Sequence, residues 1–230
     1  MSRSNRSQIA RSVACKDLRI EWNSRILTNQ VAPFAAIVMV LFAFALDNEG
    51  ILQRVAPGLV WLATMFSMLV VIQRSFAVES ADGALDALRV AGVDPVAIFI
   101  GKSLALAVQL LALEVILVFT AVVLYAVDMS ASGVGLLVVT VPVATVGLAC
   151  VGTLYGGLAA GVRGRETLLP LLLLPVVAPV LIGATRATES AFGSGGATVS
   201  EGWPWVGLLA VFAVLFVAVG SVAFGPLIDE

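Results

Sequence analysis

Few side chains in this sequence could carry out catalysis. Its 230 residues include no histidine, which removes the usual general base near neutral pH and the commonest metal ligand. The two cysteines, Cys15 in a basic segment and Cys150 in an apolar one, lack the spacing of a zinc site or a disulfide framework. We therefore predict no catalytic residue and no metal site.

Gly101-Lys102-Ser103 has the form of the last part of a phosphate-binding loop. The glycine that opens such a loop should stand five residues before Gly101, where this sequence has Val96, and an apolar run follows. Nucleotide must then bind to another chain. For Lys102 we predict an interfacial position at the start of that apolar run.

Glu114 is an acid near the middle of a long apolar run. A charge at that depth of a membrane costs at least about 2.5–3.5 kcal/mol. The carboxyl group must then be protonated, face a water-filled space, or pair with a polar group such as Gln109 of a neighbouring subunit. A pathway or gating role and a structural hydrogen bond both remain open, because intramembrane acids commonly serve function.

Composition places the elements that would position these residues in a membrane. Sixty per cent of the residues are hydrophobic and 12% are charged, against about 25% charged in soluble domains. A spanning helix needs about 20 mostly apolar residues. The six predicted spans are 31–46 (extending back through residue 27), 55–73, 103–127, 134–160, 167–185 and 205–225. We predict an all-α integral membrane protein with a single domain over 1–230, made of a tail and interfacial helix (1–29), a six-helix bundle (31–225) and a short tail (226–230).

The distribution of Lys and Arg predicts the orientation. Of the 13 Lys and Arg residues, only Arg54 and Arg186 fall on the side opposite the N-terminus. The remaining eleven lie in the N-terminal segment and in the short loops on its side. Cytoplasmic loops carry such an excess, so both termini are expected in the cytoplasm.

The segment 16–29 has the pattern of a helix that lies in the membrane interface. Leu18, Trp22 and Ile26 recur at a spacing of four and share one face. Its charged residues are Arg19, Glu21 and Arg25. Near the other end of the chain, 186–204 is rich in Gly, Ser and Thr, which predicts a flexible external loop.

The largest cytoplasmic loop contains a second short amphipathic helix. Ser80 or Asp82 can cap its start, and Gly92 with Pro95 can end it. The apolar face comprises Ala81, Ala84, Leu85, Leu88 and Ala91. This face could lie on lipid headgroups or in the groove of a partner protein.

Prolines punctuate the fifth predicted span. Pro170, Pro175 and Pro179 each remove a backbone hydrogen bond, so we expect a bent or broken helix. In the fourth span, Gly152 and Gly156 allow close backbone approach, which we assign to packing within the subunit rather than between subunits.

The loop after the second span carries the pattern Glu79…Gly83-x-Leu85-x-x-Leu88…Pro95…Gly101-Lys102. This pattern resembles the coupling loop of ABC-2 type exporter permeases. In that family a short helix of the loop sits on the ATPase subunit and passes its motion to the membrane helices. The resemblance implies a coupling helix with the residues Glu79, Asp82, Gly83, Leu85, Leu88 and Arg89.

Further motifs narrow the family. They are Arg19-x-Glu21-x-x-Ser24-Arg25, Ala56-Pro57-Gly58-x-x-Trp61, Arg74-x-Phe76-x-x-Glu79, and Arg163-x-Arg165-Glu166-x-Leu168-Leu169-Pro170 continuing into Leu174-Pro175-x-x-x-Pro179. In this order, over about residues 16–182, they are similar to cytochrome c maturation B proteins (CcmB), the haem exporter permeases.

The resemblance implies the membrane subunit of an ABC complex in a bacterial cytoplasmic membrane, with two such chains and two CcmA-type ATPase subunits. CcmC-type and CcmD-type membrane proteins and a CcmE-type haem chaperone would be partners. Haem would be the substrate, not a covalently bound cofactor, and ATP bound by the partner would drive haem export or release of the loaded chaperone. Membrane lipids are expected as partners and nucleic acid is not.

Three alternatives belong to other functional classes. An ABC-2 exporter for a lipid, polysaccharide or drug fits the loop equally well but not the narrower motifs. An intramembrane enzyme using Glu114 lacks a partner acid, a histidine or a nucleophile in a matching position. A pure scaffold would leave the activity of an ATPase subunit unchanged.

Overall fold

The computed structural model describes residues 3–25, 27–46, 48–81, 92–160 and 165–229, and over these residues the regular structure is entirely helical. The helices are α1 (Arg3–Ser24), α2 (Ala32–Ala45), α3 (Glu49–Ala81), α5 (Pro95–Leu124), α6 (Ala131–Ala160), α7 (Arg165–Phe192) and α8 (Val199–Asp229). A π-helical turn, η1 (Leu27–Val31), precedes α2, and a 3-10 turn, η2 (Ser194–Gly196), follows α7. Six helical segments are long and apolar enough to span a membrane. The prediction of an all-α, six-span membrane protein is therefore confirmed.

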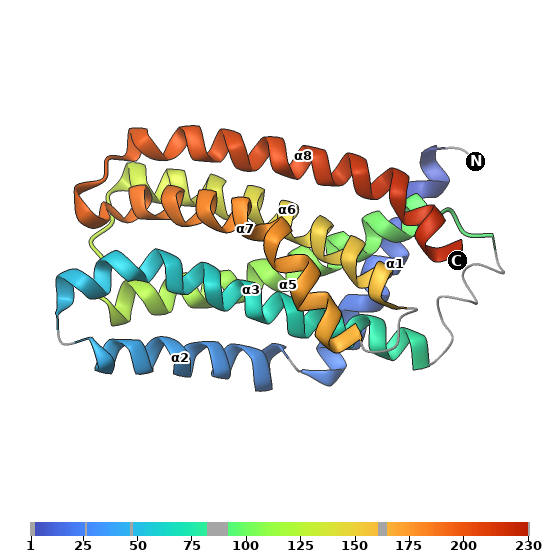
Figure 1. Ribbon diagram of the computed structural model, residues 1–230, viewed down its shortest axis with the longest axis horizontal. Helices are drawn as coiled ribbons and strands as arrows, with labels where there is room; N and C mark the ends of the chain where they lie inside the picture. The colour runs from blue at the N-terminus through green and yellow to red at the C-terminus, as the bar shows by residue number, and fades with distance from the viewer. Residues whose placement is uncertain (1–2, 26, 47, 82–91, 161–164, 230) are drawn as a thin grey trace.

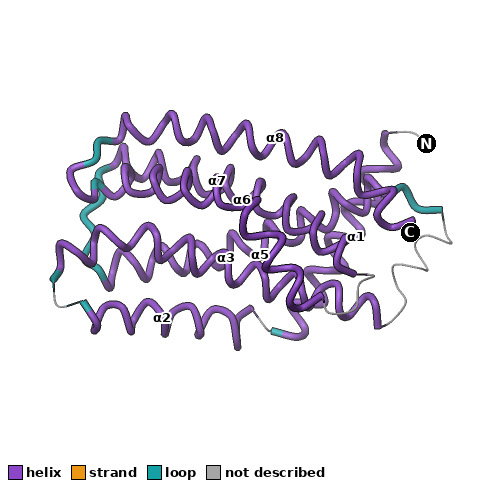
Figure 2. Tube along the Cα trace, viewed as in Figure 1, coloured by secondary structure: helices purple, strands orange, loops and turns teal. Residues whose placement is uncertain are grey.

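The long helices lie side by side in an elongated bundle, with both termini at the same end (Figure 1). α6 packs against α5, α7 and α8, while α2 lies at the edge beside α3 (Figure 2). α1 does not run along the bundle; it crosses obliquely near the end that holds the termini and packs against α5 (Figure 1).

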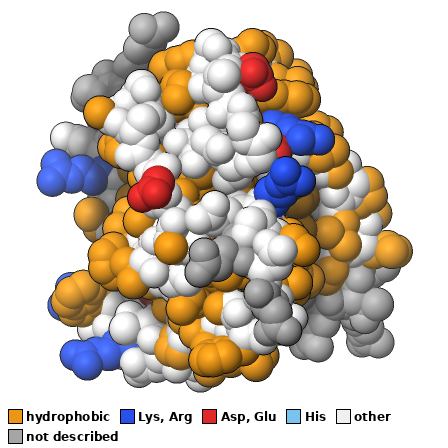
Figure 3. Space-filling view, turned by 90° about the vertical axis from the view of Figure 1, so that its left-hand side faces the viewer, with side chains coloured by type: hydrophobic (Ala, Val, Ile, Leu, Met, Phe, Trp, Pro, Cys, Tyr) orange, Lys and Arg blue, Asp and Glu red, His pale blue; other side chains and the backbone are white. Residues whose placement is uncertain are grey.

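The outside of the bundle is apolar, as expected for a protein whose solvent is lipid. Phe44, Phe119 and Val222 on three different helices are 82, 68 and 79% exposed. Figure 3 looks onto the end opposite the termini, where a few charged side chains lie among hydrophobic ones. Most of the buried polar residues that the structure describes are serines and threonines, and some of their hydroxyls bond to their own helix, such as Thr64 to Val60 O.

Several helix boundaries differ from the sequence expectation. α5 begins at Pro95, eight residues before the predicted span, because Asp94 caps it by accepting a hydrogen bond from Val96 N. The expected external loop 186–204 is wrong for most of its length, since α7 continues to Phe192 and α8 begins at Val199. The first span does start at residue 27, as predicted.

The three prolines of the fifth span bend α7 without ending it. The helix is continuous over Arg165–Phe192, and Figure 1 shows its first half veering toward α3 and α2. Pro170 accordingly lines an apolar groove with Phe34 of α2 and Phe66 of α3. A bend follows because each interior proline lacks the amide that closes a helical turn.

The glycines of α6 pack within the subunit, as predicted. A Cβ on Gly152 would lie 2.5 Å from the side chain of Ile72, and one on Gly156 would lie 2.5 Å from Phe76. Both neighbours belong to α3. The missing side chains thus let α3 and α6 approach closely where α1 crosses the bundle.

Candidate functional site

Most of the predicted coupling helix lies outside the described residues: Asp82, Gly83, Leu85, Leu88 and Arg89. Glu79 lies in the last turns of α3. The flanking helices are placed, because α3 ends at Ala81 and α5 begins at Pro95. The coupling role of these residues stays a prediction.

The N-terminal helix is longer than predicted and packs on the protein through a different face. Its buried residues are Ala10, Val13, Ala14 and Asp17, which recur at helical spacing. Leu18 is half-buried and Trp22 is 80% exposed, so the predicted apolar face points away from α5. The face with small side chains packs on α5, because small side chains let α1 lie directly on the backbone of Gly101.

The motif around Glu21 forms the turn that joins α1 to the first span. Glu21 Oε1 accepts a hydrogen bond from Leu27 N at 2.6 Å, and Ser24 Oγ donates to Glu21 O. Arg25 ends the helix with φ of 51°, a left-handed conformation that is costly for a residue with a side chain. Arg19 is exposed on the outer side of α1.

Lys102 is buried inside the protein, and its interfacial position stays a prediction. Its side chain is 3% exposed, and Nζ lies 3.4 Å from Asp17 Oδ2 of α1. Nζ also lies 4.7 Å from the centroid of the Phe76 ring of α3. An opposite charge and an aromatic face together compensate for removing the ammonium group from water.

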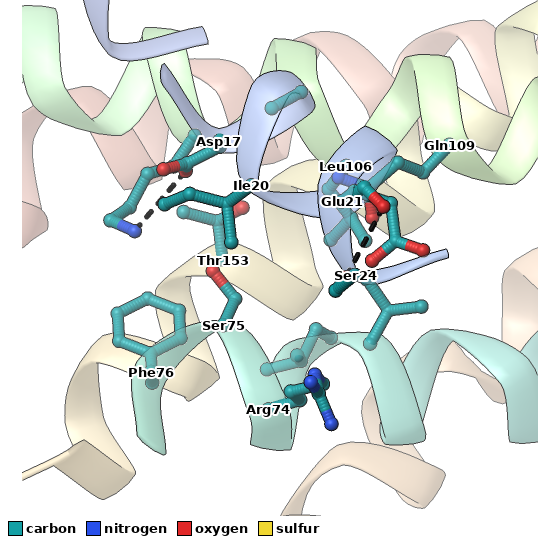
Figure 4. A pocket seen from close by; sticks show the side chains of 14 residues that line it. Asp17, Ile20, Glu21, Ser24, Arg74, Ser75, Phe76, Leu106, Gln109 and Thr153 are labelled. Atoms are coloured by element: carbon teal, nitrogen blue, oxygen red, sulfur yellow. Dashed lines mark hydrogen bonds and ion pairs between the residues drawn. The ribbon is translucent and has the colours of Figure 1, made fainter. Parts of the chain in front are cut away.

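A small pocket of about 60 Å³ opens beside this ion pair, between α1, α3, α5 and α6 (Figure 4). Its polar lining includes Glu21, Arg74, Ser75, Gln109 and Thr153. Gln109 is 8% exposed, and its Oε1 has no hydrogen-bond partner within the described part of the chain. The pocket therefore offers an unused acceptor to water or a small polar group.

Glu114 lies elsewhere on α5. It stands five residues after Gln109, so the two side chains project from the helix at angles roughly 140° apart. Its carboxyl group is fully buried, and Oε2 lies 2.5 Å from Thr145 Oγ1 of α6. Within the described chain, Glu114 is thus joined to a hydroxyl of α6, and pairing with Gln109 of a neighbouring subunit stays a prediction.

The hydrogen count at Thr145 indicates the protonation state of Glu114. Thr145 Oγ1 lies 2.6 Å from Val141 O and 2.5 Å from Glu114 Oε2. A hydroxyl has one hydrogen to donate but can accept two. Both contacts are satisfied together when Thr145 donates to Val141 and a neutral Glu114 carboxyl donates to Thr145. This is the arrangement that a protonated carboxyl group would form with Thr145.

Sequence reasoning missed Asp17, named Phe76 only as part of a family motif, and did not pair either residue with Lys102. A signal existed: Asp17 is a single acid in a basic segment, in register with the small residues Ala10 and Ala14 at a spacing of seven and three. That register predicts a buried acid, which requires a cation.

The comparison with known protein families decides what kind of chain this is. A family model described as CcmB protein matches residues 8–229. The chain belongs to the CcmB family. The match extends beyond the motifs noted in the sequence, since it includes the last helix, α8, and most of α1.

Individual CcmB relatives agree. Heme exporter protein B of Rhodobacter capsulatus is 32% identical, over 80% of this chain and 84% of its own length. Heme exporter protein B of Haemophilus influenzae is 28% identical, over 84% of this chain and 82% of its own. The protein of the same name from Pseudomonas aeruginosa is 28% identical, over 71% and 74%. The buried Lys102 pair and Glu114 both lie inside the region that matches the CcmB model.

Proposed function

We propose that this chain is the membrane permease subunit of an ABC complex for haem export in cytochrome c biogenesis. The observation that carries the proposal is the CcmB match over residues 8–229, together with relatives named heme exporter protein B. Six apolar helices supply the membrane domain of a multi-pass bacterial membrane protein. The sequence has no complete phosphate-binding loop, which suits a permease whose ATPase is a separate subunit.

The proposed complex has two copies of this chain and two CcmA-type ATPase subunits on the cytoplasmic side. Both termini and the segment 82–91 then face the cytoplasm, in line with the excess of Lys and Arg there. The helix predicted from sequence for that segment would dock its apolar face, which includes Leu85 and Leu88, in a groove of the ATPase subunit. CcmC-type, CcmD-type and CcmE-type proteins act beside it.

Haem is the proposed substrate, and ATP drives either its export or the release of the haem-loaded chaperone. The sequence has no histidine, so the iron would take its usual axial ligand from a partner protein. Glu114 is proposed to act in the pathway or its gating, because an acid buried at that depth and joined to Thr145 links α5 to α6.

Disruption of the coupling helix tests this function. In the native host, Leu88→Asp should abolish all c-type cytochromes, seen as loss of covalently bound haem in membrane proteins, while the chain stays in the membrane. Asp86→Asn, on the opposite face of the same predicted helix, is the matched control and should have no effect. A Leu88→Asp strain with normal cytochromes would refute the coupling contact. If deletion of the whole gene also left cytochromes normal, the chain would instead export other cargo.

A further inference from the structure

The N-terminal helix α1 is fastened to α5 at three places along its length. Near its start, Arg6 Nε lies 2.5 Å from Oδ2 of Asp94, the residue that caps α5. Further along, a Cβ on Gly101 would lie 2.6 Å from the α1 backbone, so the two helices touch directly. Near its end, Asp17 Oδ2 lies 3.4 Å from Lys102 Nζ. These contacts fix both the distance and the register of α1 on α5.

The Asp17–Lys102 pair reaches a third helix as well. Lys102 lies over the ring of Phe76, about one turn before α3 ends at Ala81. α5 begins at Pro95, two turns before Lys102. The helices that enter and leave the segment 82–91 are therefore connected to α1 through Lys102, in the region that Figure 4 shows from close by with Asp17 and Phe76 labelled.

We propose that Lys102 is a positioning residue for transport. With Asp17 and Phe76 it holds α1, α3 and α5 together, so that a displacement of the segment 82–91 moves all three helices as one unit. The movement continues into the first span through the turn in which Glu21 holds Leu27 N. This inference rests on the proposed function, in which the ATPase subunit acts on that segment.

The Asp17–Lys102 ion pair specifies the register of α1 on α5 more closely than an apolar contact would. Lys102 and Asp17 are 3 and 9% exposed, so their charges are removed from water together, and their contact specifies the register of α1 on α5. Lys16 provides a matched comparison on the same helix. Its Nζ lies 3.2 Å from Asp17 Oδ1, but its side chain is 39% exposed and it belongs to α1 itself. Its contact with Asp17 is thus made within one helix, at a more exposed position.

The junction can be tested on the intact complex in lipid nanodiscs by measuring distances between spin labels. The labels are placed at Arg11→Cys on the exposed side of α1 and Leu104→Cys on the exposed side of α5, after replacement of Cys15 and Cys150. The parent should give one narrow distance, unchanged by ATP. Lys102→Met should broaden it, and Lys16→Met should not. A distribution equally narrow in Lys102→Met would overturn the proposal.

The functional readout is cytochrome c formation beside ATPase turnover of the purified complex. Lys102→Met should lower cytochrome c formation about tenfold, within the range typical of coupling between sites, while ATPase turnover is retained. Lys102→Arg should restore formation, because it keeps the charge. If Lys102→Met forms cytochrome c normally while Leu88→Asp does not, the positioning role of Lys102 is refuted and the proposed function stands. If Leu88→Asp forms cytochrome c normally, the proposed coupling site is refuted instead. The distances between the spin labels would then still test whether Lys102 positions α1 on α5.

A second variant guards against misfolding. If Lys102→Met does not accumulate, Asp17→Asn replaces it, because it removes the charge pair at constant side-chain size and keeps Lys102 over Phe76. The same broadening and the same loss of formation support the proposal, and a narrow distribution with normal formation contradicts it.

Discussion

Two ionisable groups are buried on the same helix, and the protein accommodates them differently. Lys102, near the start of α5, is 3% exposed and meets a carboxylate of α1 and an aromatic ring of α3. Glu114, twelve residues later, is fully buried and meets only a hydroxyl of α6 among the described residues. The first group is paired with an opposite charge, and the second with a hydroxyl.

The difference shows that the position of a buried ionisable group along the bundle determines which kind of partner it can have. Near the end of the bundle, α1 comes from outside the membrane and can supply an acid such as Asp17, at a modest desolvation cost. In mid-span the neighbouring helices offer hydroxyls such as that of Thr145 and no opposite charge at contact distance in the described chain. A carboxyl group there has its lowest free energy when it is neutral and donates a hydrogen bond.

The largest expected effect comes from breaking the charged pair. Lys102→Met should lower the free energy of unfolding by about 1.5–3 kcal/mol, because Asp17 loses its buried interhelical partner and keeps only the more exposed Lys16. Lys16→Met should cost no more than about 1 kcal/mol, as an exposed ion pair does. Denaturant titration in detergent micelles measures both. Equal losses for the two lysines would mean that burial at this end does not distinguish them.

A smaller effect should follow from forcing the two helices apart while both charges remain. An added methyl group in Gly101→Ala would meet the backbone of Ala10 at 2.6 Å and Val13 Cβ at 2.8 Å. Backbone cannot move aside as a flexible side chain can, so we expect a loss of about 1–3 kcal/mol. Gly135→Ala, where a Cβ meets nothing within 4 Å, is the control and should change stability little. Thermal unfolding followed by circular dichroism measures the stability of both variants. Equal melting temperatures for Gly101→Ala and Gly135→Ala would show that α1 can shift to accommodate the methyl group.

The mid-span acid should tolerate a neutral replacement. Glu114→Gln keeps a donor for Thr145 and should change stability by less than about 1 kcal/mol, the usual size of such a bond in a membrane. Glu114→Ala loses the bond and should cost about 1–3 kcal/mol. In infrared spectra, a protonated carboxyl band should be present in the parent and absent from Glu114→Gln.

The same variant separates the two roles of Glu114. If the acid acts in the pathway or its gating, Glu114→Gln should assemble normally and still form less cytochrome c. Near-normal cytochrome c levels would reduce Glu114 to a structural hydrogen bond between α5 and α6. Thr145→Val, which removes the hydroxyl and leaves the acid, is the paired control.

The smallest expected effect is an increase in stability. Arg25 ends α1 with φ of 51°, and glycine adopts this conformation without the cost that a side chain brings. Arg25→Gly should therefore stabilise the turn by about 0.5–1 kcal/mol, whereas Arg25→Ala should give no gain. Unfolding of the two variants in parallel tests this, and a gain in the alanine variant would mean that the charge of Arg25, not its backbone, was unfavourable.

The membrane class, the spans and the family could be predicted from the sequence, because each depends on local composition or on motifs in order. Apolar runs of about 20 residues predict spanning helices whatever their neighbours. The bend of α7 was likewise predictable, since Pro175 removes a hydrogen bond inside its own helix. The helix boundaries at Pro95 and Phe192 were not, because caps and polar helical turns extend beyond the apolar run.

The sequence by itself thus determined what each helix is made of, and only the tertiary structure decided which side chain meets which. Asp17 and Lys102 are 85 residues apart, and Glu114 and Thr145 are 31 apart. Helical periodicity gives the residues that share a face but carries no information on the helix opposite. That choice depends on which small residues let two backbones approach, as Gly101 does for α1, and the buried charge at Lys102 is stable only because that approach brings Asp17 to it.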